Sequence, residues 1–111
     1  MSPLDQFHVL ARNIDGVQAG QMFGWNGYKL NRKFFIYFQA SPPKGQEETA
    51  SCAMVFRLSS ADATLAFSLQ GAVPFDPAGG RPMKNWAVLP DTLQEHWPEF
   101  VELAAHYVQT L

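Results

Sequence analysis

The sequence contains a single cysteine, Cys52, among its 111 residues. One cysteine cannot form a disulfide within the chain, and the first residues show no pattern of a secretory signal peptide. No apolar run approaches the roughly 20 residues that a helix needs to span a bilayer. Together these absences predict a protein of the reducing cytoplasm that does not insert into a membrane.

Motifs that carry chemistry are also missing. The three histidines have no partner at the spacing of a zinc site, and no serine lies in a Gly-x-Ser-x-Gly elbow. Glu47 and Glu48 are adjacent in a polar segment that offers no rigid support for acid–base catalysis. We therefore expect no catalytic residues, no metal and no cofactor. The side chains considered for these roles are His8, His96, His106, Cys52, Ser59, Ser60 and Ser68.

Charge is scarce and unevenly distributed. Charged residues make up 16% of the sequence, the net charge is −2, and residues 91–111 contain acids but no Lys or Arg. Lys29, Arg32 and Lys33 form a small basic cluster beside Trp25 and Tyr28. One interpretation is a nucleic-acid face, on which bases stack and cations meet phosphates. The acidic overall balance favours the other interpretation, ordinary surface charge on a hairpin.

Apolar and aromatic side chains are abundant. Hydrophobic residues account for 47% of the sequence and aromatic residues for 14%. A chain of this length can bury one modest core without a disulfide or a metal, and this composition excludes a disordered, highly charged segment. We therefore expect a single domain over residues 1–111, with a core rich in Phe, Trp and Tyr.

Apolar periodicity and turn residues predict the secondary structure. Ser2-Pro3 begins a helix that continues to about residue 15. Asn26-Gly27 is a strong hairpin signal and Asn31-Arg32 permits a second turn, which predicts a three-stranded meander over residues 22–38. The remaining predicted elements are a mobile loop over 39–50, a strand over 52–58, a short helix over 59–71, a strand over 84–89 and a helical segment over 91–111.

The predicted order is therefore α-β-β-β-β-α-β-α. Because short turns join successive strands, this order favours an antiparallel sheet packed by helices, the α+β class.

Residues 71–84, GAVPFDPAGGRPMK, are the segment richest in proline and glycine. The interpretation we favour is a rigid connector, in which the prolines restrict the unfolded chain, the glycines permit turns, and Phe75 and Met83 fill the core. Trp86 and Trp97 follow, and we expect both to pack in the core because aromatic side chains bury a large area. The alternative is that they line a groove for a partner protein, since tryptophan is enriched at interface hot spots.

A second interpretation makes this segment an anion or ligand loop. Backbone N–H groups at Gly79 and Gly80 and the Arg81 guanidinium are suited to an anion, whereas Lys84 leads into a strand and so does not predict a P-loop. Asp76 is expected either to pair with Arg81 or to cap a turn through the loop backbone. The candidate residues are Phe75, Asp76, Gly79, Gly80, Arg81 and Lys84, with Trp86 as a further wall of a small-molecule pocket.

Two blocks, GQMFGWNGYKLNRKFFIYF and GAVPFDPAGGRPMKNWAVLP, resemble the N-terminal domain of TfoX/Sxy competence regulators. The matching features are Met22-Phe23-Gly24, the hairpin from Tyr28 to Phe34-Phe35, and Pro74-Phe75 followed by Gly80-Arg81-Pro82-Met83. The resemblance implies a two-layer α/β sandwich like that of secretion chaperones, and no known enzymatic activity. Where the family turn usually carries glycine, this chain has Arg32. The competence regulators also have a second, helical domain that these residues do not include.

The sequence therefore predicts a small, non-enzymatic binding or regulatory module of the cytoplasm. We expect it to act through a protein partner, or through self-association, at the face or the edge of its sheet. Two alternatives remain open. One is a nucleic-acid-associated regulator that uses Lys29, Arg32, Lys33, Arg81 and Lys84. The other is a small-molecule or anion binder that uses residues 71–84.

Overall fold

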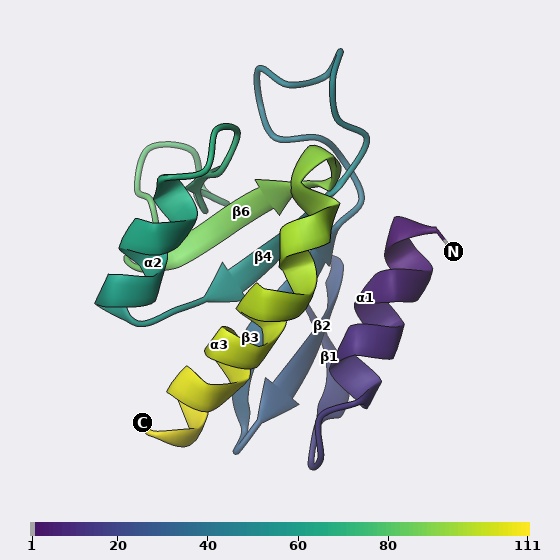
Figure 1. Ribbon diagram of the computed structural model, residues 1–111, viewed down its shortest axis with the longest axis vertical. Coiled ribbons are helices and arrows are strands. Elements are labelled where there is room, and N and C mark those ends of the chain that lie inside the picture. Colours follow the sequence, from purple (N-terminus) through teal and green to yellow (C-terminus); the bar gives the residue numbers. More distant parts are fainter. Residues whose placement is uncertain (1) are drawn as a thin grey trace.

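The computed structural model describes residues 2–111. Over these residues, six strands form one fully antiparallel sheet in the order β1-β2-β3-β4-β6-β5, with three α-helices on one face (Figure 1). The α+β class and the predicted order of elements are confirmed. A two-residue strand and a 3-10 helix are additions that the sequence did not predict.

The bounds of the last strand of the predicted meander and of the strands predicted over 52–58 and 84–89 agree closely with the structure, whereas the first two strands of the meander and the helix ends differ. The helical segments are α1 (Pro3–Arg12), α2 (Ser60–Phe67), the 3-10 helix η1 (Asp91–His96) and α3 (Trp97–Gln109). The strands are β1 (Gln18–Met22), β2 (Trp25–Leu30), β3 (Lys33–Gln39), β4 (Ala53–Arg57), β5 (Val73–Pro74) and β6 (Trp86–Pro90).

Serine caps begin the first two helices. Ser2 Oγ accepts a hydrogen bond from the Asp5 N–H at 3.1 Å, and Ser59 Oγ accepts one from the Asp62 N–H at 3.2 Å. Both caps satisfy a backbone donor that has no partner within its own helix. The helix ends come earlier than predicted, at residue 12 instead of about 15 and at residue 67 instead of 71.

The first hairpin turn differs from its prediction. Phe23 and Gly24 occupy it, with φ of 59° and 78°, whereas Asn26 and Gly27 lie within β2. The physical reason is packing, because a Cβ added to Gly27 would lie 2.7 Å from Tyr37 Cδ1. This glycine is therefore required by the close approach of β3 and not by a turn. The second turn, at residues 31–32, is as predicted.

The main core lies between the sheet and the helices. Phe7 of α1, Phe56 of β4 and Phe100 of α3 are buried there. Trp97 is fully buried and donates its Nε1–H to the Leu89 carbonyl at 3.2 Å. Trp97 lies in this core, as expected for a large aromatic side chain.

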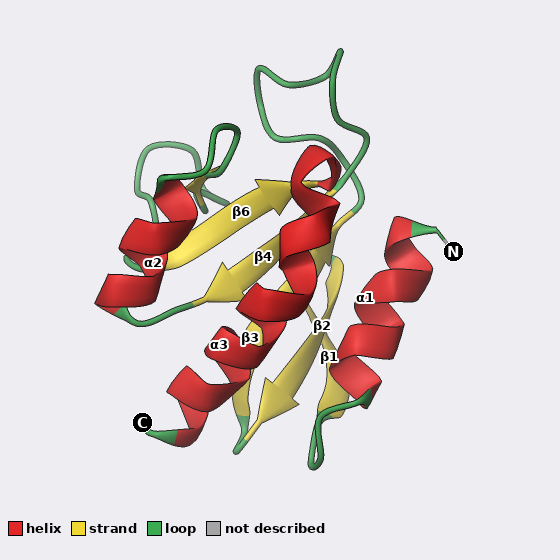
Figure 2. Cartoon of the chain, viewed as in Figure 1, coloured by secondary structure: helices red, strands yellow, loops and turns green. Residues whose placement is uncertain are grey.

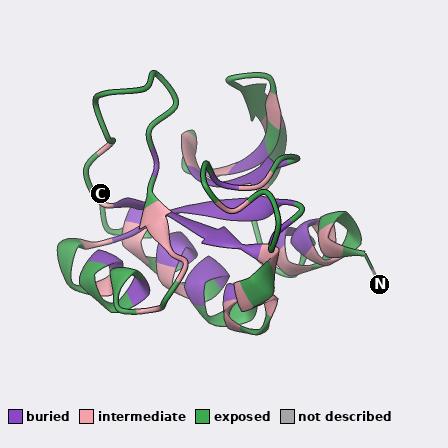
Figure 3. Ribbon diagram, turned by 90° about the horizontal axis from the view of Figure 1, so that it is seen from above, coloured by how far each residue is buried: buried purple, intermediate pink, exposed green. Residues whose placement is uncertain are grey.

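The opposite face of the sheet has a smaller core of its own. Tyr37, Val55, Trp86 and Val88 project from the strands, and Phe75 covers them. No helix within residues 2–111 packs on this face, and Figure 3 shows only strand and loop segments above it. These are the β1–β2 hairpin and the segment that follows β5, which includes residues 75–85. The predicted core position of Trp86 is thus confirmed, although it lies on the face away from the helices.

Residues 40–52 connect β3 to β4 without forming a strand or a helix, as Figure 2 shows at the top of the molecule. Two contacts fix this connection to the rest of the fold. Gln46 Nε2 donates to the Gly71 carbonyl at 2.9 Å, and the Ser51 N–H donates to Asp91 Oδ1 at 3.1 Å. The mobility of residues 39–50 stays a prediction. No helix within residues 2–111 combines the length and the apolarity needed to cross a membrane.

Candidate functional site

An open cleft of about 590 Å³ lies on the sheet face that the helices leave uncovered. Its volume is within the range of about 300–1,000 Å³ that is typical of ligand-binding clefts. Segments that are far apart in the sequence form its walls. The lining residues are Trp25 and Gln39 at the ends of β2 and β3, Pro43 and Lys44 of the 40–52 connection, Val73 to Pro77, Gly79 and Gly80, and Val88 of β6.

Aromatic rings surround Phe75 at the base of the cleft. Its ring centroid lies 5.7 Å from that of Trp25, 5.8 Å from that of Phe23, and 6.0 Å from that of Trp86. The Phe75 N–H donates to the Trp86 carbonyl at 3.1 Å, and its carbonyl accepts from the Met83 N–H at 2.8 Å. Phe75 thereby holds the proline- and glycine-rich segment against the sheet, as expected for a rigid connector.

Asp76 organises the loop that follows β5. Its carboxylate accepts a hydrogen bond from the Gly80 N–H at 2.7 Å and another from the Arg81 N–H at 3.2 Å. Of the two roles expected for Asp76, the structure shows the backbone cap. It shows no ion pair between Asp76 and Arg81, both of which it describes. Of the two loop N–H groups suited to an external anion, that of Gly80 is therefore occupied by the carboxylate of the same loop, and that of Gly79 donates to the Asp76 backbone carbonyl at 3.4 Å.

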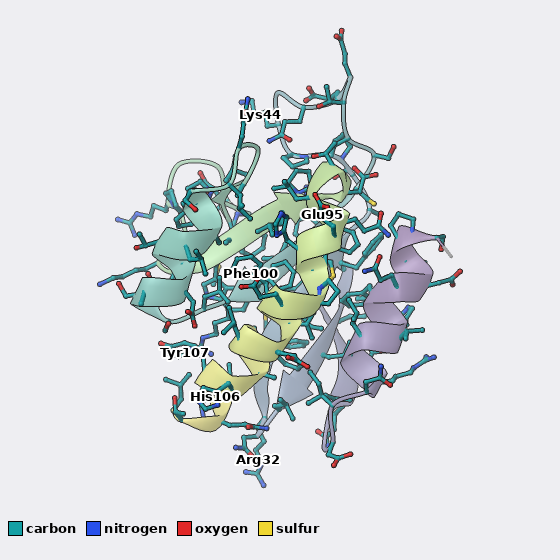
Figure 4. All side chains as sticks on the ribbon, in the orientation of Figure 1. Arg32, Lys44, Glu95, Phe100, His106 and Tyr107 are labelled. Atoms are coloured by element: carbon teal, nitrogen blue, oxygen red, sulfur yellow. The ribbon has the colours of Figure 1, made fainter. Side chains whose placement is uncertain are left out.

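The predicted basic residues lie in separate places. Lys29 Nζ is 5.0 Å from the Phe34 ring centroid, and Arg32 occupies the β2–β3 turn with φ of 67°. Lys33 is the first residue of β3, so these three cations stay together at one end of the sheet. Figure 4 shows Arg32 and the cleft residue Lys44 at opposite ends of the molecule.

Arg57, a cation that the sequence did not single out, lies on the face of the sheet away from the helices. Its guanidinium carbon is 5.8 Å from the ring of Trp86, which belongs to the smaller core on that face. The loop cations Arg81 and Lys84 are both exposed, and Lys84 precedes the start of β6.

Charged side chains are distributed unevenly between the two layers of the fold, with cations in the strands and most acidic residues in the helical segments. The strands contain Lys29, Lys33 and Arg57 and no Asp or Glu, whereas Arg12 is the one cation in the helical segments within residues 2–111. The acidic residues of those helical segments are Asp5, Asp62, Asp91, Glu95, Glu99 and Glu102. Over residues 2–111, the structure contains one ion pair, between His96 Nε2 and Glu95 Oε1 at 3.9 Å. The cations of the sheet thus have no carboxylate partner among the described residues.

Among the described residues, the groups with shifted pKa values are His8, Tyr37, Glu47 and Cys52. Burial raises the pKa of the Cys52 thiol to about 11, and nearby Asp91 adds to this effect. Burial also raises the pKa of Tyr37 to about 12, and the Tyr37 O–H donates to Met22 Sδ at 3.1 Å. Both groups are therefore neutral at pH 7.

His8 lies on the helix side of the sheet. Burial lowers its pKa, with a further contribution from the Arg12 charge, and a 2.8 Å hydrogen bond joins its Nδ1 to the Tyr28 hydroxyl. Within residues 2–111, no three His, Cys, Asp or Glu side chains lie close enough together to hold a metal ion.

Sequence reasoning identified part of the cleft. It placed Phe75 and Asp76 in a candidate pocket, and both line the cleft, whereas Arg81 and Trp86 are not among its lining residues. It missed Gln39 and Lys44, because nothing in a polar connection indicates which side chain will lie beside β5. It assigned Trp25 to a basic face, whereas the structure places this side chain against Phe75.

Comparisons with known proteins give no family to which the site can be assigned. No family model, curated protein or solved structure matches the chain. The resemblance to the TfoX/Sxy domain therefore stays a prediction.

Proposed function

We propose that this protein is a non-enzymatic binding module whose cleft accepts an acidic segment of a partner protein. In this proposal, one aromatic or aliphatic side chain of the segment lies against Trp25, and a carboxylate of the segment faces Lys44 in the cleft wall. The resemblance to the TfoX/Sxy domain supports a regulatory role in the cytoplasm, which is part of the same proposal. The single observation that carries it is the aromatic-walled cleft on a sheet face that no described helix covers.

The apolar part of the cleft suits one inserted side chain. Trp25 is partly exposed in the wall, and Pro43, Val73 and Pro74 line the same space. Tryptophan is enriched among the residues that contribute most to protein–protein binding, because it supplies a large apolar area near the centre of an interface. Phe23, half exposed at the hairpin tip, extends the apolar surface beside Phe75.

The charge of the surroundings favours an acidic partner. Lys44 lies in the cleft wall, and the strands of the sheet carry cations without any Asp or Glu. Two carboxylates lie near the cleft. Asp76 faces its own loop backbone. Glu47 accepts a hydrogen bond from the Gly45 N–H at 3.0 Å and interacts electrostatically with Lys44. Complementary charge accelerates association and selects among partners, and an acidic segment meets no repelling carboxylate on the strands.

A protein segment fits this surface better than single-stranded nucleic acid. Bases bind to aromatic rings whose faces are open to solvent. Here Tyr37 is 1%, Phe75 2% and Trp86 8% exposed, so these three rings offer no open face, and Trp25 is the partly exposed ring in the cleft wall. A small metabolite is also less suited, because it needs convergent polar groups. The Gln39 amide donates to the Ser41 carbonyl at 2.9 Å, and Asp76 is occupied by its loop.

A peptide-display selection on the purified protein tests the proposal. We expect the enriched sequences to carry Asp or Glu on both sides of an aromatic or aliphatic residue. Fluorescence anisotropy with a synthetic peptide from this set should show binding at least about tenfold weaker for Lys44→Glu and for Trp25→Ala, the scale of a 1.4 kcal/mol contact. Arg12→Glu makes the same charge change in the helix layer and should bind like the wild type.

Three outcomes would contradict the proposal. The first is that the enriched peptides are basic or uncharged, and the second is that Lys44→Glu binds them as the wild type does. The third is that no peptide is enriched on the wild type above the level found with Trp25→Ala. If the protein bound a thymidine oligonucleotide in a salt-dependent way, and Lys44→Glu weakened that binding, the ligand of the cleft would be nucleic acid and not an acidic protein segment.

A further inference from the structure

The outer edge of β1 lacks the proline and the charged side chains that often prevent pairing with another strand. β1, with the sequence QAGQM, forms one edge of the sheet and pairs only with β2. It contains no proline and no charged side chain, the two features that most often block a sheet edge. The other edge, β5, is two residues long and ends in Pro74. One edge of this fold is therefore blocked and the other is open.

The hydrogen-bonding register shows which groups of β1 are free. The two-residue turn places Met22 opposite Trp25, and Gly20 is opposite Gly27. In such a hairpin these are the pairs that exchange backbone hydrogen bonds. The intervening residues, Ala19 and Gln21, therefore direct their N–H and C=O groups away from β2. No other strand within residues 2–111 pairs with this side of β1.

We propose that two copies of this chain join through antiparallel pairing of their β1 strands, across a two-fold axis at Gly20, to form one continuous sheet. In this register Ala19 lies opposite Gln21 of the partner subunit, and Gln21 lies opposite the partner subunit's Ala19. Both residues carry outward N–H and C=O groups, so each pair can exchange two hydrogen bonds. Gly20 lies opposite Gly20 of the partner subunit at the closely spaced, non-hydrogen-bonded position.

The helix beside this edge makes a second copy the favoured occupant. In the view of Figure 1, α1 lies in front of β1, in the helix layer. His8, near the middle of α1, bonds to Tyr28, which is paired with Ala19, so the middle of the helix is level with the proposed axis. The two-fold axis then places α1 antiparallel to its copy at the same height, as an isologous interface requires.

The ends of α1 are complementary to each other. Asp5 lies near its start and Arg12 at its end, seven residues apart and thus on the same side of the helix. Neither has an ion-pair partner among the described residues. An antiparallel copy brings the acidic end of one helix to the basic end of the other. Leu4 and Val9, both exposed large apolar side chains of α1, provide surface that a copy can cover.

Paired charge substitutions at Ala19 and Gln21 test both the dimer and its register. The Lys/Lys variant, Ala19→Lys with Gln21→Lys, places like charges opposite each other at both symmetric pairs of the dimer. The Lys/Glu variant, Ala19→Lys with Gln21→Glu, places opposite charges at the same two pairs. By sedimentation velocity, we expect the wild type and the Lys/Glu variant to dimerise and the Lys/Lys variant to dimerise at least about tenfold more weakly. Circular dichroism and thermal unfolding check that each variant folds.

A second variant, Ala19→Pro, removes one outward N–H from each chain. Proline is accepted on an edge strand where the N–H faces solvent, so the variant should fold as a monomer. The proposal is overturned if the wild type stays monomeric up to about 1 mM, the limit of weak association. It is also overturned if the Lys/Lys and Lys/Glu variants dimerise equally well, or if Ala19→Pro leaves the dimer intact. None of these measurements uses the cleft, so this proposal and the proposed function fail separately.

Discussion

At the scale of single residues, both hairpin turns hold non-glycine side chains in the left-handed region. Phe23 has φ of 59° and Arg32 has φ of 67°. An L-residue loses about 1–2 kcal/mol in this conformation, because its Cβ approaches the following carbonyl. Phe23 has compensating ring contacts with Tyr37 and Phe75. Arg32 is exposed and forms no ion pair among the described residues, so its strain has no visible compensation.

Arg32→Gly should therefore stabilise the protein. The substitution relieves the left-handed strain, while glycine costs about 0.5–1 kcal/mol in extra entropy of the unfolded chain, which leaves a net gain of up to about 1.5 kcal/mol. Urea unfolding followed by circular dichroism measures this gain. Arg32→Ala is the control, because it removes the charge and keeps the strain. Equal stability of the two variants would show that backbone strain at this turn is unimportant.

Gly27 should tolerate no side chain. In Gly27→Ala, the new Cβ would lie 2.7 Å from Tyr37 Cδ1 and 2.9 Å from the Ile36 carbonyl oxygen. Such overpacking costs about 1–3 kcal/mol, which urea unfolding detects. Asn26→Ala is the control and should cost much less, because this exposed residue lies within β2 and not in a turn. A large loss in Asn26→Ala would instead support the turn that the Asn-Gly pair suggests.

At the scale of elements, the two helix starts and the proline- and glycine-rich connector were predictable for the same reason. Ser2 and Ser59 cap helices through residues only three positions away, so the signal is local. Asp76 likewise bonds to N–H groups four and five positions along the chain. The short strand β5 was not predictable, because Val73 and Pro74 become a strand only through pairing with Val88 and Ala87.

Asp76→Ala should loosen the loop after β5 without unfolding the sheet. The Gly80 and Arg81 N–H groups lose their acceptor, so their amide hydrogen exchange should accelerate by about tenfold or more, the effect of one lost hydrogen bond of about 1.4 kcal/mol. Nuclear magnetic resonance measures the two amides individually. The Phe75 N–H, which donates to Trp86, is the internal control and should keep its protection. Unchanged exchange at Gly80 and Arg81 would contradict the proposed role of the carboxylate.

At the scale of the whole molecule, the two largest pKa shifts predict sensitivity to alkaline pH. Burial raises the pKa of Cys52 from 9.0 to about 11 and that of Tyr37 from 10.0 to about 12. The folded state therefore binds these protons more tightly than the unfolded state does. Their contribution to stability is fully present below pH 9, and it decreases as the pH rises toward 11 and 12.

Urea unfolding at pH 8, 9.5 and 10.5 should therefore show a falling free energy of unfolding. In Cys52→Ala, the decrease between pH 8 and 9.5 should be smaller, because only the Tyr37 contribution remains and it begins to fall near pH 10. An identical pH profile for the wild type and the variant would mean that the thiol ionises equally easily in both states.

The sequence by itself determined the α+β class, the order of the main elements and the core positions of Trp86 and Trp97. Those features follow from periodicity, caps and turn residues, which act over a few positions of the chain. Tertiary structure alone decided that Phe23-Gly24 and not Asn26-Gly27 forms the first turn, because only the approach of Tyr37 requires glycine at position 27. It also decided the cleft, whose walls come from residues 25, 39–44, 73–80 and 88. No local sequence pattern predicts that these segments form one cleft, because they come together through the pairing order of strands distant in the sequence.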